Sequence, residues 1–333
     1  MAMIDSQYLY SIGRVRELEK KLLSEANLLR IVEADDPWPV LKSLEFFRVG
    51  EDLDHQTPSH EIFRRERLQN RQLLHELVAG SPLEDIFLLP YDVENIKLFL
   101  KGKLSGNASV KELDVEEGLY HKTELLEAIY EELPTSVFPQ FVDAVKQLTE
   151  EFPAHRKYAL VDSRLDQVLR TMQTEYARRA KSTFLIDYFQ RLSDLQNISI
   201  IVRRKWHQSE REALGEYLFK SGTLAPSFLE RVCEGGWESL TSALKPTVYG
   251  KIMTDVMADV NQSSFLPLFD AICANAMMTH LRTAKYLSVG IEPVLAFYLA
   301  REHELKLVRL ILAGKTFNYS KEHLGSRLRE LFE

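Results

Sequence analysis

Apolar side chains recur every three or four residues between Gly290 and Lys315, near the end of the chain. This spacing places them on one face of an α-helix. The apolar positions are Leu295, Leu299, Leu305, Val308 and Leu312. Pro293 suits the first turn and Gly314 the end, while Glu302 and Lys306 form an i,i+4 pair on the predicted solvent face. The pattern predicts one long helix over residues 290–315.

The second half of this pattern occurs in three places, at residues 92–103, 194–205 and 304–315. Each copy begins with an acid (Asp92, Asp194, Glu304), has a β-branched residue four positions later (Ile96, Ile198, Val308), and ends with a lysine (Lys103, Lys205, Lys315). The acids lie 102 and 110 residues apart. Self-similarity at a nearly fixed period predicts an internal threefold repeat of about 110 residues. We place the repeats at residues 1–110, 111–212 and 213–333.

The remaining pattern is also helical. Helical spacing predicts further helices near residues 4–22, 40–47, 60–79 and 160–180, with a polar loop at 51–59. Nowhere does strict alternation of apolar and polar residues persist long enough to demand a strand. The predicted fold class is therefore all-α, in three similar helical bundles.

Composition and charge narrow the function. Apolar residues make up 45% of the chain and charged residues 27%, as in an ordinary globular protein. A net charge of −7 disfavours general nucleic-acid binding. Cys233 and Cys273 form no disulfide framework or CxxC pair, and we expect them to be reduced and buried in a cytoplasmic protein.

The sequence also predicts that the chain does not cross a membrane. Its longest run without a charged side chain, from Ala271 to Leu281, has eleven residues, whereas a spanning helix needs about twenty. Asp5, Arg14 and Arg16 interrupt the start before a signal-peptide hydrophobic region could form. Any work at a membrane would then depend on binding to another protein.

A search for catalytic chemistry gives no candidate site. Gly314-Lys315-Thr316 resembles the end of a phosphate-binding loop, but that motif requires glycine where the chain has Arg309, and here the segment ends a helix. His55 and His60 lie five residues apart with no third metal ligand in register. Neither a G-x-S-x-G elbow nor a cysteine–histidine pair is apparent. We therefore predict no catalytic, cofactor or metal site.

Two basic clusters remain, at residues 178–181 and at Arg203, Arg204 and Lys205. Both lie at predicted helix C-termini, where cations are stabilised by the helix dipole. Capping is the structural interpretation. The functional interpretation is docking to an acidic surface of a partner protein, and we retain Arg203, Arg204 and Lys205 as candidate partner contacts.

These residues carry a family resemblance over essentially the whole chain. It resembles the C subunit of bacterial and archaeal V/A-type rotary ATPases, which is related to the vacuolar d subunit. The stretches that carry the likeness are Tyr8-Leu9-Tyr10, residues 13–16, residues 92–97 and 101–103, Glu292-Pro293, Glu302-His303-Glu304, Arg309 and Gly314-Lys315. The middle copy departs most, with Arg204 where the outer copies have Gly102 and Gly314. This difference calls its helix-end geometry into question.

The resemblance implies three helical bundles forming a funnel around a pseudo-threefold axis. It implies a non-catalytic rotor subunit at the cytoplasmic face of the membrane, one copy per complex, in a machine for ATP-coupled ion transport. Such a protein receives the central stalk, built from the D and F subunits, and joins it to the membrane rotor ring. Two alternatives stay open from the sequence: a free-standing helical-repeat adaptor for other proteins, and an α-helical enzyme with an unrecognised site.

Overall fold

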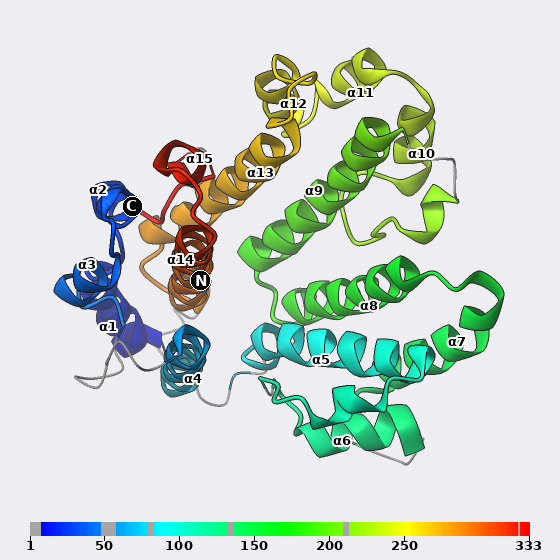
Figure 1. Ribbon diagram of the computed structural model, residues 1–333, viewed down its shortest axis with the longest axis horizontal. Coiled ribbons are helices and arrows are strands. Elements are labelled where there is room, and N and C mark those ends of the chain that lie inside the picture. Colours follow the sequence, from blue (N-terminus) through cyan, green and yellow to red (C-terminus); the bar gives the residue numbers. More distant parts are fainter. Residues whose placement is uncertain are drawn as a thin grey trace, which may run out of the picture. The chain divides into compact units, whose positions relative to one another are not determined.

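The computed structural model describes residues 8–47, 58–78, 81, 83–116, 118–131, 136–208, 213–325 and 327–333. Within these ranges the secondary structure is helical and contains no strand, which confirms the predicted all-α class (Figure 1). The chain divides into two compact units. Unit 1 combines Met1–Ser81 with Leu244–Glu333, and unit 2 is Pro82–Ala243.

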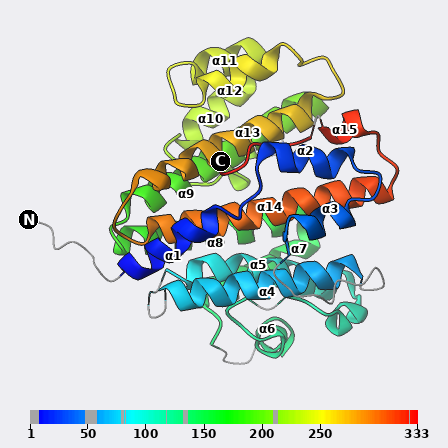
Figure 2. The same cartoon turned by 90° about the vertical axis from the view of Figure 1, so that its left-hand side faces the viewer.

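Unit 1 is built from two segments that are distant in sequence. Its elements are α1 (Leu9–Glu19), α2 (Glu25–Glu33), α3 (Trp38–Ser43), α4 (Ser59–Val78), α12 (Gly250–Met257), α13 (Phe265–Arg282), η5 (Thr283–Tyr286), α14 (Glu292–Thr316) and α15 (Lys321–Gly325). The apolar stripe of α14, including Leu305, Val308 and Leu312, packs with Leu28 of α2 and Phe63 of α4 in one core. Figure 2 shows α1, α2, α3 and α4 lying along α14.

Unit 2 is built from consecutive helices. Its elements are α5 (Asp85–Ser105), η2 (Ala108–Glu112), α6 (Lys122–Leu126), a π-helical turn η3 (Glu127–Glu131), α7 (Pro139–His155), α8 (Tyr158–Arg179), α9 (Thr183–His207), η4 (Leu214–Glu216) and α10 (Pro226–Glu234); α11 (Trp237–Leu244) ends at its boundary. Helix α8 packs against both α5 and α9. Phe99 and Phe141 are fully buried in a core cluster of this unit.

The long helices agree with the sequence pattern. The helices predicted over 60–79, 160–180 and 290–315 are confirmed by α4, α8 and α14. Most of the predicted polar loop at 51–59 lies outside the described residues, and so does His55. None of the described helices is both long and apolar enough to cross a membrane.

Three details of the predictions are wrong. Gly314 lies inside α14, and the left-handed residue is Asn318 (φ 56°). Glycine at position 314 serves packing instead, because a side chain there would collide with Leu324 of α15. Glu302 does not form a solvent-exposed pair; it is 9% exposed and accepts a hydrogen bond from Asn70. The two cysteines, predicted to be buried, are only half-buried.

Candidate functional site: three helix clamps

The structure separates the three predicted contact residues at the end of α9. Arg203 is exposed, and its Nε donates to Ser199 Oγ at 3.2 Å. The Arg204 guanidinium lies 5.3 Å from the centre of the Tyr217 ring, a cation–π contact. Lys205 points into the unit, where its ammonium binds backbone carbonyls. Arg203 is therefore the most exposed of the three.

The carbonyls bound by Lys205 belong to the end of α10, and the start of α10 is bound by another residue of α9. The buried Asp194 carboxylate accepts hydrogen bonds from the backbone N–H groups of Thr223 (2.9 Å) and Leu224 (3.0 Å), just before α10 begins. Lys205 Nζ donates to the carbonyl of Cys233 at 2.8 Å, in the last turn of α10. One long helix thus holds a short helix by both ends.

The same arrangement occurs on α5. Asp92 is fully buried, and its carboxylate accepts hydrogen bonds from the backbone N–H groups of Leu119 (2.7 Å), Gly118 (3.2 Å) and Tyr120 (3.3 Å), before α6 begins. Lys103 Nζ donates to the carbonyl of Ile129 at 2.6 Å, in the turn η3 that continues α6. Helix α5 therefore holds the helical segment formed by α6 and η3.

The third arrangement, on α14, joins residues far apart in sequence. Glu304 is fully buried, and its Oε1 accepts a hydrogen bond from the backbone N–H of Leu23 at 2.6 Å. Lys315 Nζ donates to the carbonyls of Val32 (2.7 Å) and Ala34 (2.5 Å). Helix α14, near one end of the sequence, therefore holds α2, near the other.

The chemistry of these contacts follows from helix geometry. The first N–H groups and last C=O groups of an α-helix lack partners within the helix, and its ends carry positive and negative partial charge respectively. A carboxylate at the start and an ammonium at the end match both. In each case the acid and the lysine are 11 residues apart, which is about 16 Å along a helix. The backbone segment that they bind is nearly as long. We call each arrangement a helix clamp: clamp one on α5, clamp two on α9 and clamp three on α14.

Clamps one and two share a second polar contact. Asn95 Nδ2 donates to the carbonyl of Glu116 at 2.8 Å. Asn197 forms two hydrogen bonds with the backbone of Phe219, one to its carbonyl and one from its N–H. The corresponding position in clamp three is Leu307, which is buried in the apolar core.

Clamp three instead contains a buried network of charges centred on Arg301, which is 3% exposed. Its guanidinium binds Glu304 at 2.9 Å and Glu66 of α4 at 2.8 Å. It also donates to the carbonyl of Phe46 and lies 4.2 Å from the centre of the Phe46 ring. Arg301 therefore connects α14 with α4 and with the residues after α3.

The three clamp helices end alike. Three positions after each clamp lysine, a residue has a left-handed backbone: Gly106 (φ 73°), Gln208 (φ 48°) and Asn318 (φ 56°). The departure at Arg204 therefore leaves the helix-end geometry unchanged. Its neighbour in space differs instead, because a Cβ at Gly102 would lie 2.1 Å from Val110, whereas Arg204 covers Tyr217.

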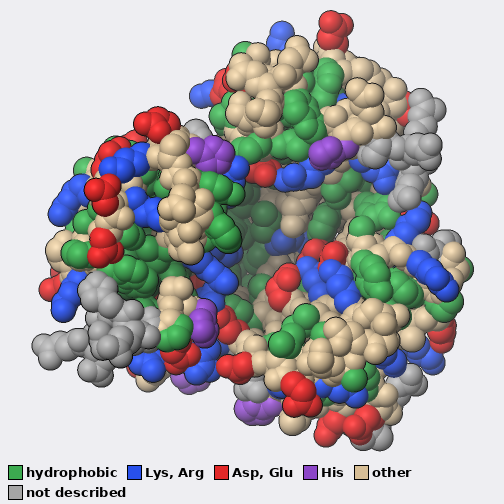
Figure 3. All heavy atoms as spheres, viewed as in Figure 1, with side chains coloured by type: hydrophobic (Ala, Val, Ile, Leu, Met, Phe, Trp, Pro, Cys, Tyr) green, Lys and Arg blue, Asp and Glu red, His purple; other side chains and the backbone are tan. Residues whose placement is uncertain are grey.

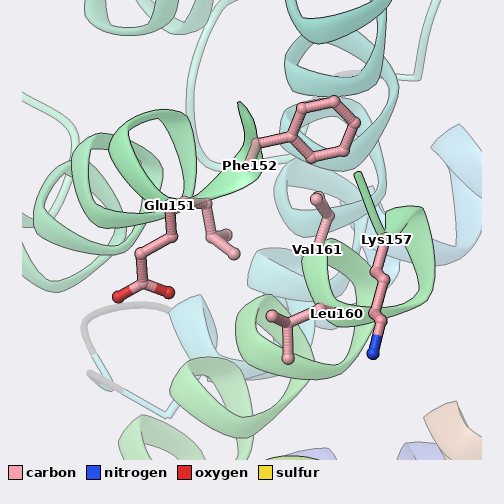
Figure 4. Close-up of a pocket in the computed structure, with 6 residues that line it drawn as sticks. Glu151, Phe152, Lys157, Leu160 and Val161 are labelled. Atoms are coloured by element: carbon pink, nitrogen blue, oxygen red, sulfur yellow. The ribbon is translucent and has the colours of Figure 1, made fainter. Parts of the chain in front are cut away.

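The pocket between α7 and α8 is a poor candidate for a small-molecule site. This pocket has a cavity volume of only about 10 Å³ and is lined by Leu148, Glu151, Phe152, Lys157, Leu160 and Val161. In Figure 4 the Glu151 carboxylate and the Lys157 amine lie on opposite sides of the apolar lining residues, so they do not converge on a ligand. Ligand sites are typically larger and have converging polar groups. The described residues also contain no group of three His, Cys, Asp or Glu that could hold a metal ion.

Sequence reasoning found half of each clamp. It identified the acids and lysines from their recurrence, but it placed Lys315 near the dipole of its own helix rather than at the end of α2. The partners are backbone groups, which leave no signature in side-chain pattern. The sequence signal that could have found the clamped helices is a leucine at matching places in all three. These residues are Leu28, Leu125 and Leu229, and the structure buries each of them.

Comparison with known proteins places the chain in a family. The family model described as ATP synthase (C/AC39) subunit matches residues 11–327. The C subunit of the V-type sodium ATPase of Enterococcus hirae is 22% identical, with 81% of each chain covered. The C subunits of the A-type ATP synthases of Methanosarcina acetivorans and Methanocaldococcus jannaschii are 23% and 21% identical, covering 97% of this chain and 93% and 86% of theirs. The chain belongs to the C/AC39 family of V-type and A-type rotary ATPase subunits.

Proposed function

We propose that this protein is the non-catalytic central-rotor component of a V/A-type ATPase, a socket that links the central stalk to the membrane rotor ring and transmits torque. The observation that carries the proposal is the family match over residues 11–327. The partners we propose are the D and F subunits of the stalk and the subunits of the ring, with one copy per complex. The protein would lie at the cytoplasmic face, held through the ring.

We further propose that the chain consists of three repeats, at 1–110, 111–212 and 213–333, arranged cyclically as a funnel. Under this division each clamp helix holds the short helix of the next repeat: α5 holds α6, α9 holds α10, and α14 holds α2. The third contact returns from the last repeat to the first, so the series of clamps closes on itself. This closure supports a cyclic arrangement.

Torque transmission requires that the bundles do not shear past one another. Each clamp supplies charge-assisted hydrogen bonds from a buried acid and a lysine, and such bonds are about twice as strong as neutral ones. Figure 3 shows lysine and arginine side chains interspersed with aspartate and glutamate on the visible face of both units. A mixed polar surface suits an assembly in which large interfaces carry polar rims.

The proposal is tested by affinity purification of the tagged chain from gently solubilised native membranes, with the stoichiometry of its companions quantified. We expect one copy per three catalytic ATPase subunits, together with D, F and ring subunits. Recovery of the chain alone, or with unrelated soluble proteins, would contradict the proposal and favour the adaptor.

The candidate contact at the end of α9 is tested by reversing a single charge. Because Lys205 holds α10, reversing its charge would disturb the fold as well as any interface. We therefore propose Arg203→Glu alone, with Arg231→Glu on the exposed face of α10 as the matched control. We expect Arg203→Glu to weaken retention of the complex as salt is raised; equal retention of both variants and the natural protein would exclude this contact.

A further inference from the structure

Arg170, in the middle of α8, is a buried cation with no carboxylate partner among the described residues. Figure 1 shows α8 between α5 and α9. Arg170 is 7% exposed, and its guanidinium donates to the side-chain oxygens of Gln173 (2.8 Å) and Gln196 (3.4 Å) and lies 5.7 Å from the centre of the Phe189 ring. Its Nε is buried and forms no hydrogen bond with the described part of the chain. Burial lowers the pKa of Arg170 to about 10, because removal from water disfavours the charged form.

The neighbouring cations between α5 and α8 are paired. Lys97 of α5 is 8% exposed, and its Nζ lies 2.7 Å from a carboxylate oxygen of Asp166 on α8. One turn farther along α5, Lys101 binds Asp162. Buried cations usually have such partners, because an uncompensated charge away from water is costly. Arg170 is thus a buried cation that the described residues do not compensate in this way.

The guanidinium of Arg170 is already oriented. Gln173 is 4% exposed, and its Nε2 donates to the carbonyl of Ile86 on α5 at 2.8 Å, which fixes its Oε1 beside Arg170. Gln196 of α9 is only half-buried, and its hydrogen bond with Arg170 is long. Side-chain rotation is common when proteins bind one another, so Gln196 is the contact that gives way to a stronger acceptor. A carboxylate is such an acceptor, because it matches the planar guanidinium with two parallel hydrogen bonds.

The chain around Arg170 is basic. Residues 167–186 contain four cations, Arg170, Arg178, Arg179 and Lys181, and one acid, Glu175, whereas the whole chain has a net charge of −7. The last three cations are exposed at the turn between α8 and α9, and no described carboxylate pairs with them. A local excess of positive charge on an acidic protein attracts an acidic partner to that place.

We propose that Arg170 binds the carboxylate of an aspartate or glutamate from a partner subunit of the rotor, and that the basic turn at residues 178–181 guides this acid to it. The inference rests on the proposed function, which supplies the partner. A phosphate group carries more charge and commonly gathers several cations, but Lys97 and Lys101 are already engaged. One guanidinium therefore fits one carboxylate. Binding exchanges the long contact with Gln196 for a charge-assisted pair.

The first test uses the purified full chain and Arg170→Met. We expect the thermal midpoint to stay unchanged or to rise, because replacing an uncompensated buried charge by an apolar side chain removes a desolvation cost. Lys97→Met is the matched control: it deprives Asp166 of its cation and should lower the midpoint by several degrees. A decrease for Arg170→Met as large as that for Lys97→Met would overturn the proposal, because the guanidinium would then have its partners within the chain.

The second test uses the complex recovered from native membranes with the tagged chain. We expect Arg170→Met to release the companion subunits at least about tenfold faster than the natural protein during washing at raised salt, because the acid of the partner loses its cation. Arg170→Lys keeps the charge and should restore part of the retention, which separates charge from packing. Equal retention of Arg170→Met and the natural protein would overturn this inference and leave the proposed function intact. Recovery of the natural chain alone would contradict the proposed function and, with it, this inference.

Discussion

Clamp two on α9 and clamp three on α14 perform the same task with different residues. In clamp two an aspartate receives two backbone N–H groups and a threonine hydroxyl from the segment before α10. In clamp three a glutamate receives the backbone N–H of Leu23, and its second oxygen binds Arg301. One clamp is made of hydrogen bonds to a single loop, and the other adds a buried ion pair.

The loop opposite the acid explains the difference. Gly222 faces Asp194 and Gly118 faces Asp92, so closely that a Cβ would lie 2.0 Å and 2.4 Å from a carboxylate oxygen. Counted from the residues that the acids bind, the same place in clamp three is Lys21. A loop residue with a side chain cannot approach the clamp helix so closely, and we infer that the longer glutamate of clamp three makes up this distance. Acid length and loop glycine are therefore coupled features.

The largest effect that would separate the two clamps is expected for Arg301→Met. This change leaves Glu66 and Glu304 buried without their shared cation, which costs about 3–5 kcal/mol. Arg191 occupies the corresponding place on α9 and pairs with the more exposed Asp187, so Arg191→Met should cost less than about 1 kcal/mol. Free energies of unfolding from urea titration compare the two. Equal losses would mean that the ion pair is not what distinguishes clamp three.

A smaller loss is expected for Gly222→Ala. The new Cβ would collide with the Asp194 carboxylate and push the loop away from it, and such overpacking costs about 1–3 kcal/mol. Gly13→Ala on α1 is the matched control, because nothing lies within 4 Å of a Cβ there, and alanine favours a helix by about 1 kcal/mol. Hydrogen exchange should rise in α10 for Gly222→Ala only. A neutral Gly222→Ala would contradict the coupling of glycine to aspartate.

Reciprocal exchange of the acids sharpens the same comparison. Glu304→Asp withdraws the carboxylate from Leu23, and Asp194→Glu forces an extra methylene against Gly222, so each should destabilise its own unit by about 1–2 kcal/mol. Adding Gly222→Ala to Asp194→Glu would raise the loss further if the loop cannot retreat. Thermal unfolding monitored by circular dichroism measures both. Two silent exchanges would show that side-chain length at the acid is unimportant.

The smallest effect is a pH dependence found in α14. Burial lowers the pKa of His303 to about 4, and its Nε2 lies 3.1 Å from the carbonyl of Glu330. The unfolded chain takes up this proton near pH 6.5, before the folded chain does, so the free energy of unfolding falls as pH drops from 6.5 toward 4. At about pH 5.5 the loss is about 1 kcal/mol. His303→Gln should remove this component; an identical pH profile would show that His303 does not contribute.

The sequence predicted the helices well because their apolar spacing is long and regular. It predicted the three acid–lysine pairs because recurrence can be read without knowing what each residue binds. It could not place α2 beside α14, because the contacts between Lys315 and the carbonyls of Val32 and Ala34 connect parts of the chain that nothing in the pattern links. Pairing of a side chain with a distant backbone group depends on tertiary structure alone.

Two errors at α14 have the same physical origin. Glycine is common at helix termini, but at Gly314 the missing side chain allows Leu324 to approach closely. Glu302 has the spacing of a solvent-exposed pair with Lys306, but Asn70 of α4 buries it. Helical spacing identifies a face of a helix; it does not show which faces the neighbouring helices cover. Helices α2, α3 and α4 together cover more of α14 than its apolar stripe.

The central claim is that each clamp lysine holds one particular short helix. Its most direct test is hydrogen exchange, read by mass spectrometry, in the three variants Lys103→Met, Lys205→Met and Lys315→Met. Each removes one ammonium and keeps a long side chain. We expect exchange to rise about tenfold in a single segment each time: residues 122–131, 226–234 and 25–33 respectively. Increases spread evenly over all three segments, or no increase in any, would contradict the account.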